Sequence, residues 1–342
     1  MKIEIFEDSP GRWDEYVLNN DNASIYHLHD WGTFFKHIYK FKSLNLVVYE
    51  GNVIVGITTL ILMRNHLMKK MFVSLPYFCV GGILADNSYV EKLILKKVKE
   101  LTISHKCSYT LLRNAQINNK SGYDYIDRQK ATFVLPLETD SEKVFSRFER
   151  QVRRRIRKGY KSGCEIDISK KYLDDFYDIY RRNMRHLGSP AHKKAFYTEI
   201  LNQFPDNYTF LVVLNKKKVV GAQLLSYFKN KIYLPLASSL REYNEYSPNH
   251  LLYWESIKFG CENGYEFCDF GRSTIGSGPY IFKKQWNAKE YPLSYCYFYS
   301  KGNMNNQNGH SYGKLRLVSQ LWKQMPLKTT NILGPYLSKW LP

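Results

Sequence analysis

Several features that would assign a function at once are missing from this sequence. It contains no GxxxxGK[ST] phosphate loop, no GxGxxG between a strand and a helix, and no GxSxG. Interpretations as a nucleoside triphosphatase, a dinucleotide enzyme or a serine hydrolase therefore lack support. There is also no HExxH, and the nine histidines are dispersed, so no metal is expected.

Cysteine is scarce, and long apolar runs are absent. The six cysteines contain no CxxC pair, and Cys261 and Cys268 are spaced poorly for zinc, so they are expected to be buried thiols in a reducing compartment. No run approaches the ~18 apolar residues of a spanning helix, and the N-terminal residues lack the apolar core of a signal peptide. These absences predict a cytoplasmic protein without a membrane span.

Acidic residues are outnumbered by basic ones. Lys and Arg total 50 against 31 Asp and Glu, which gives a formal charge of +19. Such a field favours nucleic acid, phosphorylated metabolites or an acidic membrane surface as partners. With 44% hydrophobic and 15% aromatic residues among 342, the chain can fill the cores of two domains.

The expected pattern of strands and helices occurs twice. The first copy has strands at 44–50, 53–63 and 71–78, a helix at 89–104 and a strand at 108–113. The second has helices at 172–185 and 191–203, strands at 208–214, 219–228 and 231–238, a helix at 249–263 and a strand at 266–271. Matching residues support a duplication: Val55-Gly56-Ile57 with Val220-Gly221-Ala222, and Leu75-Pro76 with Leu234-Pro235. We therefore predict an α/β protein with α+β mixed sheets in two tandem β-β-β-α-β domains, each with preceding helices.

A basic helix is expected between the two copies, at 142–163. Val144, Phe148, Val152, Ile156 and Tyr160 recur every fourth residue and form an apolar stripe. Arginines and lysines occupy the remaining surface, among them Arg153, Arg154, Arg157 and Lys158. This surface is either a solvated face or an anion-binding one. The expected domains are 1–140, the connecting helix 141–163, 164–300, and a linker with an amphipathic tail at 301–342.

The tail mixes apolar residues with lysines. It either packs on the body or lies on a membrane surface as a basic amphipathic element. Pro326 and Pro335 are expected to prevent one long helix.

The candidate site is the segment 269–286. It follows a strand, runs through Gly276 and Gly278, and returns to apolar structure at 280–282 before Lys283 and Lys284. Glycines let a backbone bend closely around a ligand, and a lysine there can hold a phosphate or stabilise charge on an acyl carbonyl. The alternative is a hairpin with solvated lysines.

Together, the segments 153–159, 185–190, 270–273 and 278–283 resemble the FemAB-like branch of the GNAT superfamily. The resemblance spans roughly the whole chain and implies two tandem GNAT domains. No coiled-coil arm is inserted. The tail, with Trp322, 325–327 and 333–335, further resembles FemAB-related proteins of exopolysaccharide and exosortase systems.

The resemblance implies an aminoacyltransferase of cell-envelope glycan biosynthesis. Its members move an amino acid from aminoacyl-tRNA directly to an amine of a peptidoglycan precursor. By the resemblance, Phe282 and Lys283 match the pair placed at the tRNA acceptor end and the transferring ester, and Lys36 and Arg185 match basic residues that hold the diphosphate of the precursor. Trp31, Arg272 and Tyr280 are further candidates for substrate binding. The charge of the basic helix makes Arg153, Arg154, Arg157 and Lys158 the candidates for binding tRNA or another anion. Lys283 is the expected stabiliser of the tetrahedral oxyanion, and Asp269 or the substrate itself is the candidate base.

The donor and acceptor leave alternatives open. No cofactor is expected if aminoacyl-tRNA is the donor, and acyl-CoA is the alternative donor for an N-acyltransferase. The stretch 241–249, where a CoA loop would lie, has no glycine and contains Glu242 and Glu245, which disfavours a pyrophosphate. The acceptor is a peptidoglycan or exopolysaccharide precursor, linked to a nucleotide or to a lipid, with peripheral contact at the inner face of the membrane. A non-catalytic tRNA- or RNA-binding protein is the remaining alternative.

Overall fold

The computed structural model describes residues 1–114, 122–300 and 311–341, with the backbone alone for 311–317. The chain divides into two compact units. Unit 1 comprises Met1–Lys130, Pro292–Lys314 and Leu337–Pro342, and unit 2 comprises Ala131–Tyr291 and Leu315–Tyr336.

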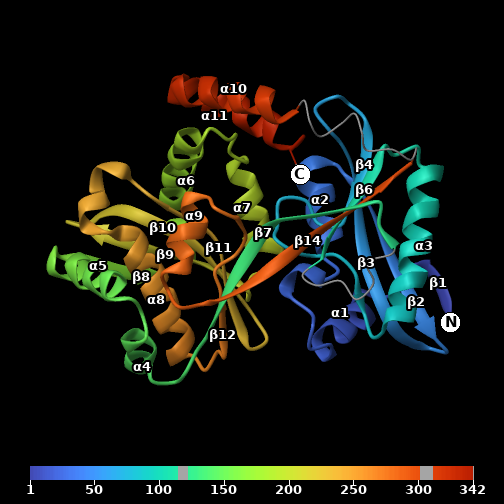
Figure 1. The fold of residues 1–342 in the computed structure, drawn as a ribbon, viewed down its shortest axis with the longest axis horizontal. Helices are drawn as coiled ribbons and strands as arrows, with labels where there is room; N and C mark the ends of the chain where they lie inside the picture. Colours follow the sequence, from blue (N-terminus) through green and yellow to red (C-terminus); the bar gives the residue numbers. More distant parts are fainter. Residues whose placement is uncertain (115–121, 301–310, 342) are drawn as a thin grey trace. The chain divides into compact units, whose positions relative to one another are not determined.

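Unit 1 has a mixed sheet and helices before and within it (Figure 1). Its elements are β1 (Lys2–Ile5), α1 (Pro10–Asn19), η1 (Ile25–His27), α2 (Trp31–Tyr39), β2 (Lys42–Glu50), β3 (Val53–Arg64), β4 (Lys70–Val73), β5 (Leu84–Ala85), α3 (Ser88–Ser104), β6 (Tyr109–Asn114), the first half of β7 (Tyr125–Pro136) and most of β14 (Lys289–Tyr299).

Unit 2 repeats this plan with more helices. Its elements are the end of β7, α4 (Ser141–Ser146), α5 (Arg150–Lys161), β8 (Cys164–Ile168), η3 (Lys170–Tyr172), α6 (Leu173–Leu187), α7 (Lys194–Gln203), β9 (Tyr208–Asn215), β10 (Lys218–Phe228), β11 (Lys231–Ser239), η4 (Arg241–Tyr246), α8 (Pro248–Glu262), β12 (Phe267–Asp269), β13 (Ser273–Thr274), α9 (Gly278–Lys284), and most of α10 (Ser311–Gln324) and α11 (Leu327–Ser338).

Both units have the same strand order. In unit 1 the order β1-β2-β3-β4 is antiparallel, β4 pairs in parallel with β6, and β6 pairs antiparallel with β14. In unit 2 the order β8-β9-β10-β11 is antiparallel, β11 pairs in parallel with β12, and β12 pairs antiparallel with β7. The predicted α/β class and the repeated β-β-β-α-β order are confirmed.

The last strand of each sheet comes from an unexpected part of the chain. β7 follows β6 in sequence, yet its residues 134–136 pair with β12 of unit 2. β14 follows β12, yet its residues 294–299 pair with β6 of unit 1. The two units thus exchange their final strands, and the observed division differs from the expected boundaries at 140 and 300. The basic segment 141–163 lies within unit 2, and residues 301–310 of the expected linker lie outside the described residues.

The duplication extends to the irregularities of the sheets. In the β2–β3 pair, Val55 is skipped in the register, and Gly56 follows it. In the β9–β10 pair, Val220 is skipped, and Gly221 follows it. A bulge inserts one extra residue and increases the local twist, so the matched Val-Gly pairs mark the same bend in both units.

Helix α3 shows how the predicted apolar face is buried. Val90, Ile94 and Val98 are fully buried in the core of unit 1. The Asn87 side chain caps the helix by accepting from the backbone N–H groups of Tyr89 and Val90, both at 3.0 Å.

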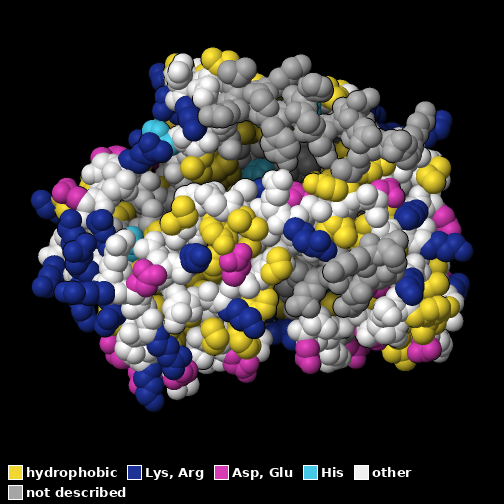
Figure 2. Space-filling model, viewed as in Figure 1, with side chains coloured by type: hydrophobic (Ala, Val, Ile, Leu, Met, Phe, Trp, Pro, Cys, Tyr) yellow, Lys and Arg dark blue, Asp and Glu magenta, His cyan; other side chains and the backbone are white. Residues whose placement is uncertain are grey.

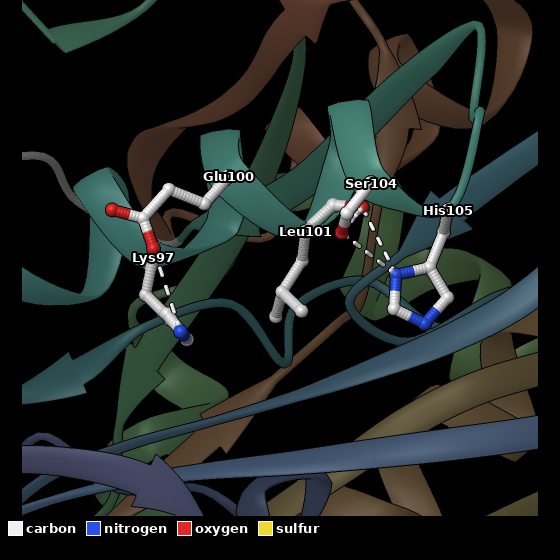
Figure 3. Close-up of polar contacts among 5 residues, drawn as sticks. All are labelled: Lys97, Glu100, Leu101, Ser104 and His105. Carbon is white, nitrogen blue, oxygen red and sulfur yellow. Dashed lines mark hydrogen bonds and ion pairs between the residues drawn. The ribbon is translucent and has the colours of Figure 1, made fainter.

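The C-terminal end of α3 is closed by local polar contacts (Figure 3). Ser104 Oγ donates to the Leu101 carbonyl at 3.3 Å, and His105 Nδ1 lies 3.1 Å from the same oxygen. Lys97 and Glu100 form an exposed ion pair one turn earlier at 3.4 Å. The same carbonyl also accepts from the His105 backbone N–H at 3.0 Å, so the side chains of Ser104 and His105 add to the backbone bond that ends the helix.

The expected single helix at 142–163 is two helices. The chain turns between α4 and α5, and this turn lets Phe145 and Phe148 both pack on Trp254 at ring distances of 4.9 and 5.9 Å. Tyr160, expected on the apolar stripe, is 40% exposed and donates to Glu255. A four-residue period cannot show that the helix bends to bury two rings.

The tail forms two helices. Pro326 separates α10 from α11 as expected, whereas Pro335 lies inside α11, which continues to Ser338. Trp322 is 5% exposed, so α10 packs on unit 2. Among the described residues, none of the helices combines the length and apolar character that a bilayer crossing requires.

The bulge glycines give a test of the packing. A Cβ added to Gly56 would lie 2.4 Å from Val90 Cγ1 of α3, whereas one added to Gly221 would lie 3.2 Å from Pro248 Cβ of α8. We expect Gly56→Ala to lower the free energy of unfolding by about 1–3 kcal/mol through overpacking. Gly221→Ala, the matched control, should cost less in urea unfolding; an equal or smaller loss for Gly56→Ala would contradict the described packing.

Candidate functional site

The candidate site begins where β12 ends. After Asp269 the backbone passes through Gly271, whose φ is +72°. A Cβ on this residue would lie 3.1 Å from the Leu234 carbonyl oxygen of β11. Both the positive φ and the close approach require glycine here, and they bring the loop against the end of the parallel strand pair.

The loop leads into α9, which places Lys283. Ser277 caps this seven-residue helix, with its hydroxyl accepting from the Tyr280 N–H at 3.4 Å, and Pro279 lies in its first turn. The return to apolar structure expected at 280–282 is thus a helical turn, in which Tyr280 and Phe282 pack against the core of unit 2 and Ile281 is 62% exposed. A short helix capped by serine and begun by proline was readable from the sequence but was not predicted.

Lys283 is buried, at 6% exposure. Its Nζ donates to the carbonyl oxygens of Gly271 at 2.8 Å and Arg272 at 3.2 Å. These bonds tie α9 to the end of β12 and hold a positive charge away from water. Lys284, the next residue, is exposed. The alternative of two solvated lysines is thus wrong for Lys283 and right for Lys284.

Phe282 lies in an aromatic cluster. Its ring contacts His250 and Tyr253 of α8, both at 5.0 Å, and Trp286 at 5.9 Å. Burial, and secondarily the charge of Arg155, lower the pKa of His250 to about 4, so its ring is neutral near pH 7. The cluster fixes Phe282, and with it α9, against α8.

Two further expected site residues lie on the same loop and helix. Arg272 is half-buried, and its carbonyl accepts from Lys283. Tyr280 is half-buried, packs on Phe133 at 5.2 Å and donates its hydroxyl to Glu290 at 2.8 Å. That hydrogen bond raises the pKa of Tyr280, so this tyrosine is a neutral donor at neutral pH.

Asp269 is held at the strand end. Its Oδ1 accepts from the Thr132 hydroxyl and from the Gly271 N–H at 2.8 Å. This oxygen therefore fixes the loop that carries Lys283.

A basic cavity lies elsewhere in unit 2, beyond the end of β11. Its volume is about 140 Å³, and it is lined by Arg182, Asn183, Arg185, His186, Ser239, Leu240, Arg241, Glu242 and Leu327. Arg185, an expected substrate residue, also donates from Nε to the Met325 carbonyl at 2.6 Å. Burial, Arg241 and Arg185, in that order, lower the pKa of His186, since nearby cations oppose its protonation. The cavity has the charge to hold a small anion.

Arg182 and Arg241 were not predicted to share this cavity with Arg185. Arg182 lies three residues before Arg185 on α6, a spacing that places both on one face of the helix. Arg241 comes from η4, far away in the sequence, and joins them through the packing of α6 against β10 and β11.

Helix α5 carries the expected anion-binding residues. Arg154, Arg157 and Lys158 are exposed and Arg153 is half-buried, while Val152 and Ile156 are buried on the other face. Figure 2 shows Lys and Arg side chains gathered where Figure 1 draws α5. Such a strip suits a nucleic-acid backbone.

The remaining expected residues lie in unit 1. Lys36 is exposed on α2. Trp31 is fully buried, and its Nε1 donates to the Ile25 carbonyl at 2.8 Å. The expectation that Trp31 contacts substrate is corrected: a tryptophan with no exposed surface anchors α2 instead.

The described residues contain no candidate metal site. Across 1–114, 122–300 and 311–341, no group of three or more His, Cys, Asp or Glu side chains is placed to hold an ion.

Comparison with known proteins places these observations among transferases. A family model described as an acetyltransferase (GNAT) domain matches residues 146–284. Lipid II:glycine glycyltransferase of Staphylococcus haemolyticus is 20% identical over 372 residues, which cover 80% of this chain and 87% of the relative. The Staphylococcus epidermidis protein of the same name is 20% identical over 373 residues, with the same coverage.

Solved structures share the fold. FemX matches with a TM-score of 0.67 at 13% identity, covering 86% of this chain and 97% of FemX. A tandem GNAT protein from the clavulanic acid biosynthesis pathway matches with a TM-score of 0.57 at 9% identity, covering 89% of this chain and all (100%) of that protein. The tandem arrangement predicted from the repeat is confirmed.

The charges around the cavity can be tested by titrating His186. We expect Arg185→Gln to raise the pKa of His186, because one of the cations that oppose its protonation is removed. Arg182→Gln, which changes another arginine lining the cavity, is the matched control and should leave this pKa nearer to that of the unchanged protein. NMR titration of the imidazole measures both; a pKa unaffected by Arg185→Gln would contradict the described geometry.

Proposed function

Because this chain is a member of the FemAB-like branch of the GNAT superfamily, and hence an acyltransferase, we propose that it is an aminoacyltransferase of cell-wall glycan biosynthesis. In this proposal it transfers an aminoacyl group from aminoacyl-tRNA to an amine of a peptidoglycan or exopolysaccharide precursor. The amine attacks the ester carbonyl directly, and no covalent enzyme intermediate forms.

The observation that carries the proposal is the buried ammonium of Lys283. An aminoacyl ester is already activated, so positioning and stabilisation of the tetrahedral oxyanion suffice for transfer. A cation held at 6% exposure against a strand end acts in a medium of low dielectric constant, where its charge stabilises a nearby oxyanion more than it would in water. In the proposal, the Phe282 cluster flanks the acceptor end of the tRNA.

The proton of the attacking amine has two candidate destinations. Asp269 Oδ1 already accepts from Thr132 and Gly271, which disfavours Asp269 as the base. The substrate itself is the better candidate: as the tetrahedral intermediate collapses, the departing ribose oxygen takes up a proton. Arg272 and Tyr280 are proposed to contact the substrate beside Lys283.

The acceptor is proposed to bind through its diphosphate. The cavity with Arg182, Arg185 and Arg241 supplies guanidinium groups, which pair with phosphate oxygens in a bidentate fashion. Lys36, exposed on α2 of unit 1, is a separate candidate for holding a diphosphate. The curated relatives are named for transfer to lipid II, which supports a precursor of this class and peripheral action at the inner face of the membrane.

Aminoacyl-tRNA is favoured over acyl-CoA by the start of α8. A GNAT enzyme that uses CoA binds the pyrophosphate at a glycine-rich helix N-terminus through backbone N–H groups. Here Ser247 and Pro248 are buried, and proline has no N–H. Gly159 of α5 lies so close to α8 that a Cβ added to this glycine would be 2.6 Å from Leu251 Cδ1. No cofactor is therefore proposed.

The role of Lys283 is tested against its exposed neighbour. Lys283→Met is expected to reduce kcat for transfer by about 10²–10³-fold. Because two carbonyls lose their donor, it should also lower the free energy of unfolding by about 1–3 kcal/mol. Lys284→Met is the matched control and should change neither quantity. A folded Lys283→Met protein that turns over normally would refute the assignment.

The role of α5 is tested by the salt dependence of RNA binding. We expect Arg154→Gln with Lys158→Gln to weaken binding of a tRNA acceptor-stem duplex. The slope of log K against log salt should become shallower by roughly 0.7–0.9 for each phosphate that the variant no longer neutralises. Lys216→Gln with Lys217→Gln, in the exposed β9–β10 turn, is the control. Equal slopes for the two double variants would exclude α5 as the RNA site.

The same basic helix favours one alternative, a non-catalytic RNA-binding protein. A non-catalytic binder would show the same weakened RNA binding in the Arg154→Gln with Lys158→Gln variant, but it would transfer no acyl group to any acceptor. Acyl transfer by the unchanged protein, reduced in Lys283→Met, would exclude the non-catalytic alternative.

A further inference from the structure

Helix α11 turns its small residues inward and its large apolar residues outward. Thr330 is 4% exposed, and Gly334 lies so close to Ala191 that a Cβ would be 3.2 Å from that residue's backbone nitrogen and oxygen. Ile332 and Tyr336, by contrast, are 65% and 66% exposed. A helix that only packs on its own domain buries its large apolar side chains. The outward face of α11 is therefore built for something other than unit 2.

Helix α10 continues this pattern. Trp322 is buried and Ser319 lies against Gly188, whereas Val318 and Leu321 are 58% and 61% exposed. We call the exposed apolar set the hairpin face; it consists of Val318, Leu321, Ile332, Leu333 and Tyr336. Figure 2 shows hydrophobic side chains on the edge where Figure 1 draws α10 and α11. A gathering of this kind marks an interaction surface, unlike apolar residues scattered singly.

The charge around the hairpin face selects its partner. No aspartate or glutamate follows Glu290 in the sequence, whereas the basic residues after it are Lys301, Lys314, Arg316, Lys323, Lys328 and Lys339. Lys323 and Lys328 are exposed on α10 and α11 beside the apolar set. Exposed apolar side chains on a segment that carries cations and no acidic residue of its own, with a tyrosine among them, match an anionic bilayer surface. A second copy of the chain would bring these like charges together.

The hairpin also forms part of the basic cavity. Leu327, the first residue of α11, lines the cavity, and the Met325 carbonyl accepts from Arg185 Nε at 2.6 Å. The turn between the two helices therefore contacts the arginine that is proposed to bind the acceptor diphosphate. A protein docked on a membrane through this hairpin would therefore hold the basic cavity near the phosphate groups of the lipids.

We infer that the α10–α11 hairpin docks unit 2 on an anionic membrane and presents the arginine cavity to a diphosphate carried by a lipid, not by a nucleotide. The inference rests on the proposed function, because it identifies the carrier of the acceptor at the same site. Docking and diphosphate binding use different residues, so each can fail without the other.

Flotation with vesicles tests the docking. The full chain should float with phosphatidylcholine vesicles that contain phosphatidylglycerol, and float less with phosphatidylcholine alone. Ile332→Gln with Tyr336→Gln should lower the bound fraction at least about tenfold, since two large apolar side chains no longer enter the bilayer. Tyr89→Gln with Ile103→Gln on α3 is the matched control, because these residues are 59% and 63% exposed, and it should float like the unchanged protein.

Binding of two probes, inorganic pyrophosphate and a polyprenyl diphosphate in vesicles, tests whether the bound diphosphate is carried by a lipid. The double variant Ile332→Gln with Tyr336→Gln, called the hairpin variant, should bind inorganic pyrophosphate like the unchanged protein. It should no longer prefer vesicles that contain the polyprenyl diphosphate over vesicles that lack it. Arg185→Gln should float on anionic vesicles yet bind pyrophosphate weakly; normal binding by this variant would overturn the proposed diphosphate site and leave the flotation result intact. Normal flotation of the hairpin variant, or a dimer in solution that this variant dissociates, would overturn the docking inference.

Discussion

A cation buried next to a strand end must be satisfied by fixed acceptors, and this requirement organises the candidate site. Lys283 meets it with the carbonyl oxygens of Gly271 and Arg272. The arrangement requires glycine at 271, because the loop passes against the Leu234 carbonyl. It also requires the short helix α9, which brings the ammonium back to the loop. An uncompensated charge at this depth would cost several kcal/mol, so loop, helix and lysine form one structural unit.

Unit 1 also buries a cation at a strand end, but that cation comes from a different element. Arg113 at the end of β6, the counterpart of β12, is 1% exposed and donates to the carbonyls of Leu75 and Phe78 at 3.2 and 2.6 Å. Its guanidinium also lies 5.3 Å from the Tyr295 ring centroid. A buried cation thus occupies the end of the parallel strand pair in both units. In unit 1 it comes from the strand itself, and in unit 2 it comes from a helix after a glycine loop, which is the arrangement suited to a reaction site.

The repeated order of elements could be predicted because each strand and helix has its own apolar period. The Val55-Gly56 and Val220-Gly221 matches proved to be the same bulge in two sheets. The exchange of β7 and β14 could not be predicted, since hydrophobic alternation does not say which sheet a strand joins.

The candidate site was predictable in part. The segment 269–286 stood out by its glycines and lysines, but the burial of Lys283 depends on α9, whose Ser277 cap was missed. Trp31 was misassigned because a tryptophan beside a basic residue has the same sequence pattern whether it faces a ligand or the core. Arg182 and Arg185 share a helix face by their spacing, which the sequence shows, whereas Arg241 joins them only through tertiary packing.

The central claim is tested most directly by measuring which ligand, an aminoacylated RNA or an acyl-CoA, stabilises the native protein. Ligands that bind the folded state raise the melting temperature by mass action. Thermal unfolding is measured with a nonhydrolysable aminoacylated acceptor-stem mimic and, separately, with acetyl-CoA and longer acyl-CoAs. We predict that the RNA mimic raises the Tm and that the CoA thioesters do not. A rise with a CoA thioester alone would contradict the proposed donor and make the protein an acyl-CoA-dependent N-acyltransferase.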